Sequence, residues 1–593
     1  MAQFFKYFLA TVIGVLVSLF LLILIGVGII ATVATSTEKI PDVKANSVLK
    51  LTFDQPIPEL TNNVPINSFE LEPNKILGLD ALLKTLKKAQ TDERIKGIYL
   101  ELDQVSMGIT TSHQLHQALM DFREQGKFIV AYSKYLSQGA YYLASTAQPL
   151  FLNPSGMVDF RGLSTEIPFF KNLLDQTGIQ LQVYYAGQFK SATEPYRLTK
   201  MSAQNRLQLH SILGQIYNQI IENIAAARGL SKELIREVAN EYQAAIPEDA
   251  VTLKIIDQLG YEDEALAQIR TLTGLEENEK IPFISLRDYH SSYEDEVNYR
   301  IKDKIAVVYA EGAIVMGKGE NGNIGDDKYV DVLNQIYKED QVKAVVLRVN
   351  SPGGSALASA NILRVLERIR ASGRPVIVSM GDYGASGGYY IACQSDSILV
   401  QKNTLTGSIG VFSIIPNMQG LFNDHLGITF DTVKTGQFAN GISVAYQITP
   451  AEGRKIQAMT DRTYEQFLAK VAKNRNMTRD GVHDIAQGRV WTGQQAVENG
   501  LADGIGTLED AIAIAADKAK LEQYRLTTYP KVKDPFVQLV EELTGSTVRT
   551  TLEKRFIASF PALKAYLPWL NQEEEWNLGT MIQASLPFAV GLD

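Results

Sequence analysis

The chain carries two copies of one pattern, and this internal repeat constrains the fold more than any other feature of the sequence. The segment "IKGIYLELD" from Ile95 matches "VKAVVLRVN" from Val342 at an offset of 247 residues (342 − 95). Further along, "GIQLQVYYAGQFK" from Gly178 matches "GITFDTVKTGQFA" from Gly427 at an offset of 249 (427 − 178). Because the offset drifts so little, duplication of one domain explains the pattern better than chance does.

Each half has the strand and helix signals of an α/β fold. The runs "KAVVLRVN" and "RPVIVSM" are apolar and rich in β-branched residues, as buried parallel strands are. Between them, the segment from Ser355 to Arg370 has apolar residues at helical spacing, and in the first half a longer helical stripe runs from Leu209 to Ile224. Alternation of strand and helix predicts crossover units and a sheet covered by helices in each half.

The repeat also predicts the domain organisation, since 593 residues are too many for one ordinary core. We expect a first domain over 39–290, a polar linker over 291–304 and a second domain over 305–530. The residues 531–593 form a tail outside the repeat, and the sequence assigns it no role.

An apolar segment precedes the first domain. From Phe8 to Ala34 there is no charged residue, and roughly 20 helical residues are enough to span a bilayer. The sequence "ATVATS" at 31–36 is a weak match to a signal-peptide cleavage site. We therefore expect residues 1–38 to be an uncleaved membrane anchor with one transmembrane helix.

Composition excludes other classes of protein. A net charge of −9 and the lack of a Lys/Arg-rich run argue against nucleic-acid binding. The single cysteine, Cys393, has no partner for an internal disulfide, and the six histidines form no metal-binding motif. We expect no metal and no cofactor.

A candidate nucleophile lies in "YGASGGYYIA", 383–392, which recurs in the first half as "LSQGAYYLAS", 136–145. Ser386 falls on Gln138 in this match, so only the second half keeps the serine. The segment fits G-x-S-x-G at an expected turn from strand to helix, the pattern of a nucleophile elbow, with the N–H of Gly387 beside the hydroxyl. A serine that caps the following helix is the competing interpretation.

The segment "NSPGGS", 350–355, follows an expected buried strand and opens a helix. Gly353 and Gly354 can adopt backbone angles that other residues avoid, and their N–H groups could stabilise a developing oxyanion. A plain tight turn is the alternative. The first half reads "DQVSMG" at the matching position, 103–108, so it lacks the glycine turn.

A serine nucleophile needs a base, and the repeat points to a lysine. In the match of "GQFKSATEPY", 187–196, with "GQFANGISVA", Lys190 falls on Ala439. One half therefore has the serine and the other the lysine, which predicts a single composite site. Burial would have to lower the pKa of Lys190 to make the amine neutral. A hydrolase that uses His425 or His483 as its base stays open.

These motifs, together with "LTGSIG" at 405–410, resemble the signal peptide peptidase A (protease IV) family in its long, duplicated, membrane-anchored form. The resemblance implies two tandem Clp/crotonase-like domains and a serine endopeptidase that degrades cleaved signal peptides and other hydrophobic unfolded peptides. It implies Ser386 as nucleophile and Lys190 as general base. It also implies an oxyanion hole from Gly354 and Gly387, supported by Gly353, with Ser408 orienting the amine.

The same resemblance implies a homotetramer in the bacterial inner (cytoplasmic) membrane, single-pass, with its catalytic part on the periplasmic side. Peptides and the membrane are then the expected partners, and nucleic acid is not. A membrane-tethered scaffold that binds peptides without cleaving them is the non-enzymatic alternative. Ser386, Lys190, Gly354 and Ser408 in one chain argue against the scaffold.

Overall fold

The computed structural model describes residues 41–63, 76–293, 298–531 and 582–585, with isolated positions among the first 18 residues. Most of the expected transmembrane helix and most of the tail lie outside the described residues. Among the residues that are described, no helix has both the length and the hydropathy to cross a bilayer.

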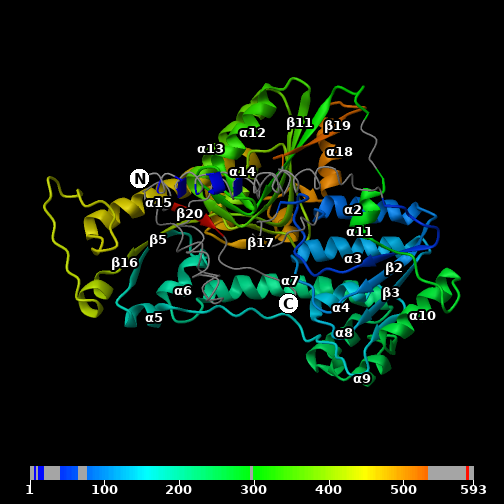
Figure 1. Ribbon diagram of the computed structural model, residues 1–593. Helices are drawn as coiled ribbons and strands as arrows, with labels where there is room; N and C mark the ends of the chain where they lie inside the picture. Colours follow the sequence, from blue (N-terminus) through cyan, green and yellow to red (C-terminus); the bar gives the residue numbers. More distant parts are fainter. Residues whose placement is uncertain are drawn as a thin grey trace.

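The first half folds around a parallel sheet with the strand order β7-β1-β2-β3-β4-β6 (Figure 1). Its strands are β1 (Ser47–Leu51), β2 (Ile95–Glu101), β3 (Phe128–Ser133), β4 (Leu150–Leu152), β6 (Gln258–Leu259) and β7 (Phe283–Ser285). Its helices are α2 (Leu79–Thr91), α3 (Ile109–Glu124), α4 (Gln138–Ala144), α5 (Lys171–Gln176), α6 (Glu194–Arg197), α7 (Ala203–Arg228), α8 (Lys232–Asn240), α9 (Pro247–Thr252), α10 (Glu262–Thr273) and α11 (Leu286–Ser291).

The second half repeats this plan with the parallel order β19-β8-β11-β13-β14-β18. Its strands are β8 (Lys304–Glu311), β11 (Val342–Ser351), β13 (Val376–Ala385), β14 (Ser397–Val400), β15 (Leu405–Gly407), β17 (Val490–Thr492), β18 (Gly504–Ile505) and β19 (Arg525–Tyr529). Its helices are α12 (Asp326–Lys338), α13 (Ala356–Ala371), α14 (Gly387–Ala392), α15 (Pro450–Arg475), α16 (Arg479–Ile485), α17 (Gly493–Glu498) and α18 (Leu508–Lys518).

Both sheets carry helices on their two faces, because alternate residues of a strand point to opposite sides. In β2, Ile98 and Leu100 join the core formed with α3 and α7, whereas Tyr99 joins a core with α10 on the other face. In β11, Val345 and Val346 are divided in the same way between α13 and α18. A mixed α/β fold whose two halves share one strand order fits tandem duplication.

Local sequence signals set the ends of the long helices. The side chain of Ser202 accepts a hydrogen bond from Asn205 N at the start of α7, and Gly229 ends that helix with a φ of 66°. At α15, Thr449 and Glu452 form a capping box around Pro450. Helix α7 packs against β17, so a first-half helix supports a second-half strand.

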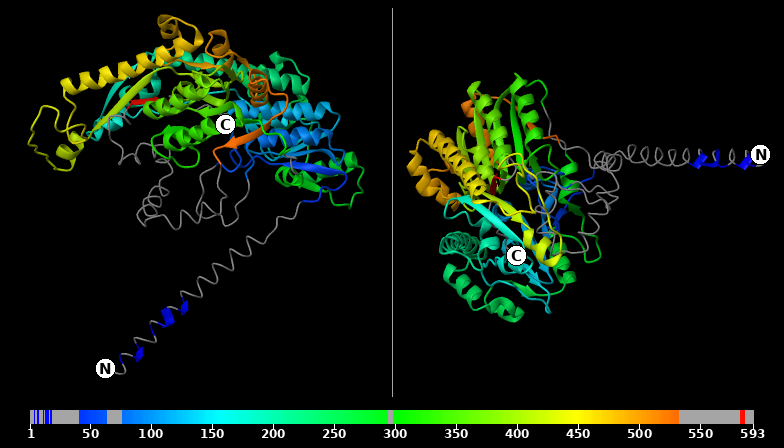
Figure 2. Two further views of the ribbon diagram at one scale, coloured as in Figure 1. Left: turned by 90° about the horizontal axis from the view of Figure 1, so that it is seen from above. Right: turned by 90° about the vertical axis from the view of Figure 1, so that its left-hand side faces the viewer.

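A third sheet joins the two halves, with the strand order β10-β9-β12-β20-β16-β5. Its strands are β10 (Asn323–Gly325), β9 (Ala313–Val315), β12 (Gly353–Ser355), β20 (Ile582–Ser585), β16 (Val411–Asn417) and β5 (Gln180–Ala186). Strand β5 of the first half pairs antiparallel with β16 of the second along its whole length. Strand β20, drawn in red in Figures 1 and 2, lies inside this folded body.

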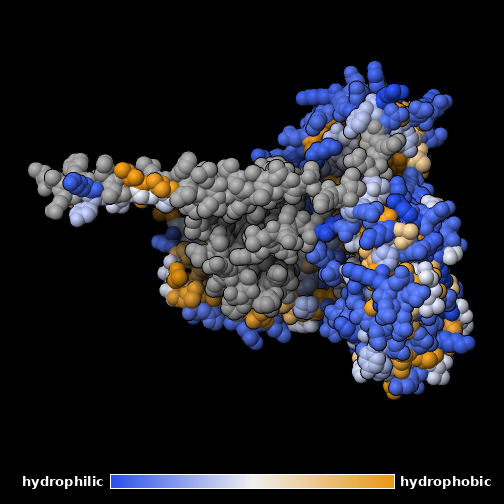
Figure 3. All heavy atoms as spheres, turned by 45° about the vertical axis from the view of Figure 1, so that its right-hand side comes forward, coloured by the Kyte–Doolittle hydropathy of each residue, from blue (hydrophilic) through white to orange (hydrophobic). Residues whose placement is uncertain are grey.

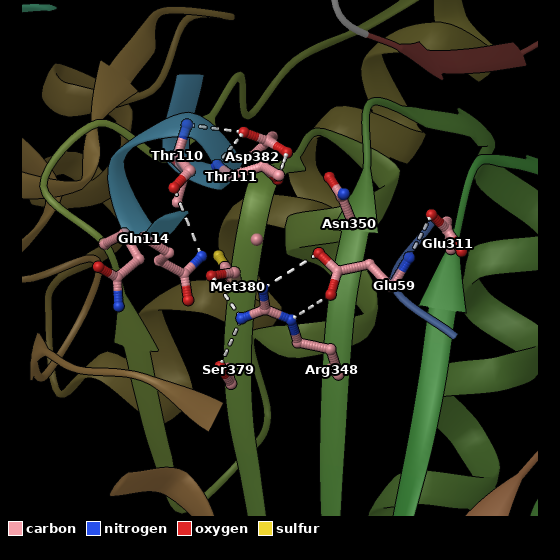
Figure 4. A network of polar contacts seen from close by, with 12 residues as sticks. Glu59, Thr110, Thr111, Gln114, Glu311, Arg348, Asn350, Ser379, Met380 and Asp382 are labelled. Atoms are coloured by element: carbon pink, nitrogen blue, oxygen red, sulfur yellow. Dashed lines mark hydrogen bonds and ion pairs between the residues drawn. The ribbon is translucent and has the colours of Figure 1, made fainter. Parts of the chain in front are cut away.

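Buried polar contacts lock the halves together (Figure 4). Glu59 of the first half forms an ion pair with Arg348 of β11 at 2.9 Å, and these side chains are only 4% and 2% exposed. Asp382 of β13 accepts hydrogen bonds from the backbone N–H groups of Thr110 and Thr111 at the start of α3. Because Asp382 lies just before Ser386, the contact also fixes the end of β13.

The described surface is mostly hydrophilic on the face drawn in Figure 3, with smaller hydrophobic patches between the polar side chains. The segment 426–438 is an exception. Five of its large apolar side chains are exposed: Leu426, Ile428, Phe430, Val433 and Phe438. Patches of this kind are typical of surfaces that another molecule covers.

Candidate active site

Ser386 occupies the turn between β13 and α14. Its backbone has φ 55° and ψ −114°, an uncommon conformation for a residue with a side chain, and its N–H donates to Gly407 O at 2.8 Å. Although Ser386 stands at the N-cap position of α14, its hydroxyl makes no capping hydrogen bond. The competing interpretation as a helix cap therefore does not describe this side chain.

Parallel pairing of β13 with β15 brings Ser408 beside Ser386. Ala385 and Gly407 are register partners at the carboxyl ends of the two strands, so the residues that follow them are neighbours. Open parallel sheets commonly form their sites at this edge. Both serines are fully buried.

Antiparallel pairing of β5 with β16 brings Lys190 to the same place. Ala186 at the end of β5 is the register partner of Val411 at the start of β16. Lys190 follows Ala186 and Ser408 precedes Val411, so both residues lie beyond the same end of the paired strands. Phe189 N–H donates to Gln487 O at 2.8 Å and holds the turn. Gly488 packs so closely that a Cβ there would stand 2.6 Å from Lys190 Cβ.

The Lys190 amine lies among serine oxygens. Its Nζ is 2.7 Å from Ser386 Oγ, and it donates to Ser408 Oγ at 3.0 Å and to Ser408 O at 3.1 Å. Lys190 is 1% exposed, and burial holds the pKa of its amine well below the ordinary lysine value. Within the described part of the chain, no carboxylate forms an ion pair with it.

The glycine turn lies on the other side of Ser386. Gly353 and Gly354 form β12 with φ of 103° and 152°, so a side chain would strain both positions. A Cβ on Gly387 would stand 3.1 Å from Gly354 N, which places the backbone nitrogens of these two glycines around one point. Two N–H groups close together suit the binding of an anionic oxygen.

The two candidate histidines have other surroundings. His483 Nδ1 lies 3.0 Å from the hydroxyl of Tyr464, and His425 ends a short π-helical turn, Leu421–His425. Neither contacts Ser386 among the interactions of the described residues. Burial raises the pKa of Cys393 to about 12, so its thiol stays protonated. No cluster of metal ligands occurs in the described ranges.

Gln138 fills the position in the first half that Ser386 has in the second. Its amide oxygen accepts from Gly162 N at 2.9 Å and its amide nitrogen donates to Gly162 O at 3.1 Å. The side chain thus ties α4 to a neighbouring loop. At this position the first half therefore has a structural side-chain contact, whereas the second half has the hydroxyl of Ser386.

Comparison with known proteins agrees with the duplicated α/β fold. The model of Peptidase family S49 matches the chain twice, at residues 121–276 and 368–522, and the matches start 247 residues apart (368 − 121), as the repeat does. The duplicated fold therefore belongs to a serine protease. The chain is a member of peptidase family S49.

Long and short relatives match different shares of the chain. "Protease 4" of Haemophilus influenzae is 34% identical over 74% of this chain and 72% of its own length. "Protease 4" of Salmonella typhi is 33% identical over 84% and 80%. A "Putative signal peptide peptidase SppA" of Enterococcus faecium is 34% identical over 45% of this chain and 77% of its own length, so it matches less than half of this chain.

Two features of the site escaped sequence reasoning. Gly488, which packs on Lys190, lies in an ordinary loop sequence and has no glycine neighbour to mark it. Strand β20 comes from the tail, where four residues are too few for a strand pattern to stand out.

Proposed function

We propose that this serine protease is an endopeptidase with a Ser-Lys dyad, in which Ser386 is the nucleophile and Lys190 the general base. The observation that carries the proposal is the 2.7 Å separation of Ser386 Oγ and Lys190 Nζ in a buried site. Serine proteases with lysine in place of histidine are a known variant of nucleophilic catalysis.

The surroundings of the amine suit a neutral base. A neutral amine has two N–H groups and one lone pair, whereas an ammonium has three donors and no acceptor. The two oxygens of Ser408 accept the two N–H groups, which leaves the lone pair for the hydroxyl proton of Ser386. Ser408 therefore orients the amine.

The reaction would proceed in two steps. Ser386 Oγ attacks the carbonyl carbon of the peptide bond while its proton passes to Lys190, and the N–H groups of Gly354 and Gly387 stabilise the oxyanion. The C–N bond then breaks, and Lys190 gives the proton to the leaving amine. Water hydrolyses the resulting ester with Lys190 as base, and the hydroxyl of Ser386 is restored.

The proposal also covers the class of peptide that is cleaved and the place of the protein in the cell. We infer two Clp/crotonase-like domains that act on cleaved signal peptides and other hydrophobic unfolded peptides. The charge-free segment 8–34 supports a single-pass membrane anchor, and we infer the bacterial inner membrane and the periplasmic side from the family resemblance. The exposed apolar segment 426–438 supports self-association, since a second copy would cover it, and we infer the homotetramer that the family resemblance implies.

Peptide hydrolysis by four single variants tests the mechanism. Ser386→Ala and Lys190→Ala should each abolish cleavage of an unfolded apolar peptide, whereas His425→Ala and His483→Ala should retain it. Loss of activity in a folded histidine variant would favour a Ser-His hydrolase. Binding of the peptide by the wild-type protein without any cleavage would favour the scaffold.

A further inference from the structure

The first half contains a cavity that the proposed mechanism does not use. Its volume is about 770 Å³, a size typical of cavities that bind ligands. Three segments form most of its wall, 53–56, 104–106 and 161–164, and Gln138 also lines it. Because Gln138 is the counterpart of Ser386, the cavity lies at the position in the first half that the catalytic site has in the second.

Backbone pairing supports this equivalence. In the first half, Leu136 forms a parallel bridge with Val158. In the second half, Gly384 pairs in parallel with Thr406. Both partners are related by one offset of 248 residues (384 − 136 and 406 − 158), so the two sheet edges have the same construction.

The repeat also relates the cavity wall to strands of the third sheet. The segment 103–108 is the counterpart of 350–355, which contains β12, and Leu163 is the counterpart of Val411 at the start of β16 (411 − 163 = 248). In the second half, β12 and β16 each pair with an extended strand, β20, that lies between them. The cavity is therefore the first-half counterpart of a site for an extended chain.

The main chain on two sides of the cavity is unpaired. The backbone N–H and C=O groups of Gln104, Val105, Leu163 and Ser164 form no hydrogen bond with other residues that the structure describes. Unpaired edges of this kind accept an added strand, whose main-chain hydrogen bonds supply affinity. A compact small molecule would leave most of these groups unpaired, so an extended peptide suits the cavity better.

The side chains of the wall favour an apolar peptide. Phe53 and Val105 are 8% and 2% exposed and give the cavity an apolar surface. Arg161 forms an ion pair with Asp159 at 2.9 Å, which compensates these two charges. Asp54 is exposed, so its carboxylate stays in contact with water. An uncharged segment therefore enters without leaving a buried charge unpaired.

We propose that this cavity binds a second extended segment of an unfolded apolar peptide and holds it without cutting it. The inference rests on the proposed function, which supplies the class of ligand. No cleavage takes place here because the side chain of Gln138 has no hydroxyl to attack a carbonyl carbon. Its amide is also occupied by hydrogen bonds with Gly162.

Photo-crosslinking of an unfolded apolar peptide to the full-length Ser386→Ala protein tests this proposal, since this variant should leave the peptide uncut. The peptide carries a benzophenone group, and mass spectrometry locates the residues to which it becomes attached. We expect attachment to the three wall segments. A second substitution, Ser164→Trp, should lower that yield about tenfold or more, because the indole takes up space in the cavity.

Ser155→Trp is the matched control, because Ser155 is also an exposed serine of the first half but does not line the cavity. It should leave the yield unchanged. Gln104→Trp fills the cavity from another wall segment and should reproduce the loss, which separates occlusion from a local folding defect at Ser164. Equal yields in all three tryptophan variants, or no attachment to the wall segments, would overturn the second peptide site.

Hydrolysis of the same peptide by the wild-type protein distinguishes failure of this inference from failure of the dyad. Normal hydrolysis with attachment confined to residues 353–355 and 411–417 would overturn the second site alone. Absence of hydrolysis, together with attachment to the wall segments that Ser164→Trp removes, would contradict the Ser-Lys mechanism and support the cavity as a peptide site.

Discussion

At the scale of single residues, the proposed chemistry depends on one amine, Lys190, for which no carboxylate forms an ion pair among the residues that the structure describes. Burial is the cause of the lowered pKa of Lys190, since desolvation disfavours the ammonium form. Ser408 then determines where the neutral amine points, because two of its oxygens accept from Nζ. Ser408 is thus a positioning residue, while Ser386 and Lys190 take part in the proton transfer.

Replacement of Ser408 by alanine removes the hydroxyl acceptor but keeps the backbone one. We expect kcat for peptide hydrolysis to fall by about 10- to 100-fold with little change in KM, because one neutral hydrogen bond to the base is lost. Steady-state kinetics across pH measure this, and Ser408→Thr, which keeps the hydroxyl, should restore part of the rate. Equal kcat values in Ser408→Ala and the wild type would remove Ser408 from the mechanism.

At the scale of elements, the site depends on where strands end. The pairing of β13 with β15 stops at Ala385, directly before Ser386, and the pairing of β5 with β16 stops at Ala186, four residues before Lys190. The pairing of β12 with β20 includes Gly354. The turn that carries Lys190 is held against the loop at Gly488, which has a φ of 78°. A small shift of that loop would move the amine away from the serine.

Gly488→Ala tests this dependence. The methyl group would stand 2.6 Å from Lys190 Cβ, so we expect activity to fall at least tenfold because the lysine is displaced. Gly427→Ala is a matched control: its φ is 67°, and a Cβ there meets nothing within 4 Å. Both variants should lose about 1–2 kcal/mol of unfolding free energy from backbone strain, measured by urea denaturation. Equal activity in both variants would contradict the argument.

The sequence predicted the individual helices and strands better than it predicted which of them lie in contact. The stripe between Ser355 and Arg370 predicted a helix, and the structure has α13 over Ala356–Ala371. Only the second half has the serine and only the first half has the lysine. This complementary pattern predicted that the side chains of Ser386 and Lys190 lie in contact. The contact of β20 with Gly354 lies beyond such reasoning, since it joins residues far apart in the chain with no repeat to relate them.

At the scale of the whole molecule, a site shared by two halves needs the halves to stay in register. The ion pair of Glu59 with Arg348 is buried between them and is reinforced by a hydrogen bond from Arg348 to Ser379 Oγ at 2.9 Å. Removal of one partner would leave an unpaired buried charge. The duplicated chain thus uses a buried ion pair to hold its halves, whereas most of its other ion pairs are more exposed.

Glu59→Gln leaves Arg348 without its buried counter-charge. We expect a loss of about 3–5 kcal/mol in unfolding free energy, measured by urea denaturation followed by tryptophan fluorescence. The exposed ion pair of Lys87 with Glu509 also links the halves, so Lys87→Met is a matched control that should cost less than about 1 kcal/mol. Equal urea midpoints for Glu59→Gln and Lys87→Met would show that burial gives the first pair no special weight.

The rate at which a fluorophosphonate labels Ser386, measured across pH in the wild type and in Lys190→Met, tests the composite site most directly. Methionine keeps an unbranched apolar chain but has no amine. The account predicts labelling of the wild type that rises with pH as Lys190 loses its proton, at a pH well below the ordinary lysine pKa of 10.5. It predicts labelling of Lys190→Met that is slower by about 100-fold or more. Labelling of both proteins at the same rate and with the same pH dependence would contradict it.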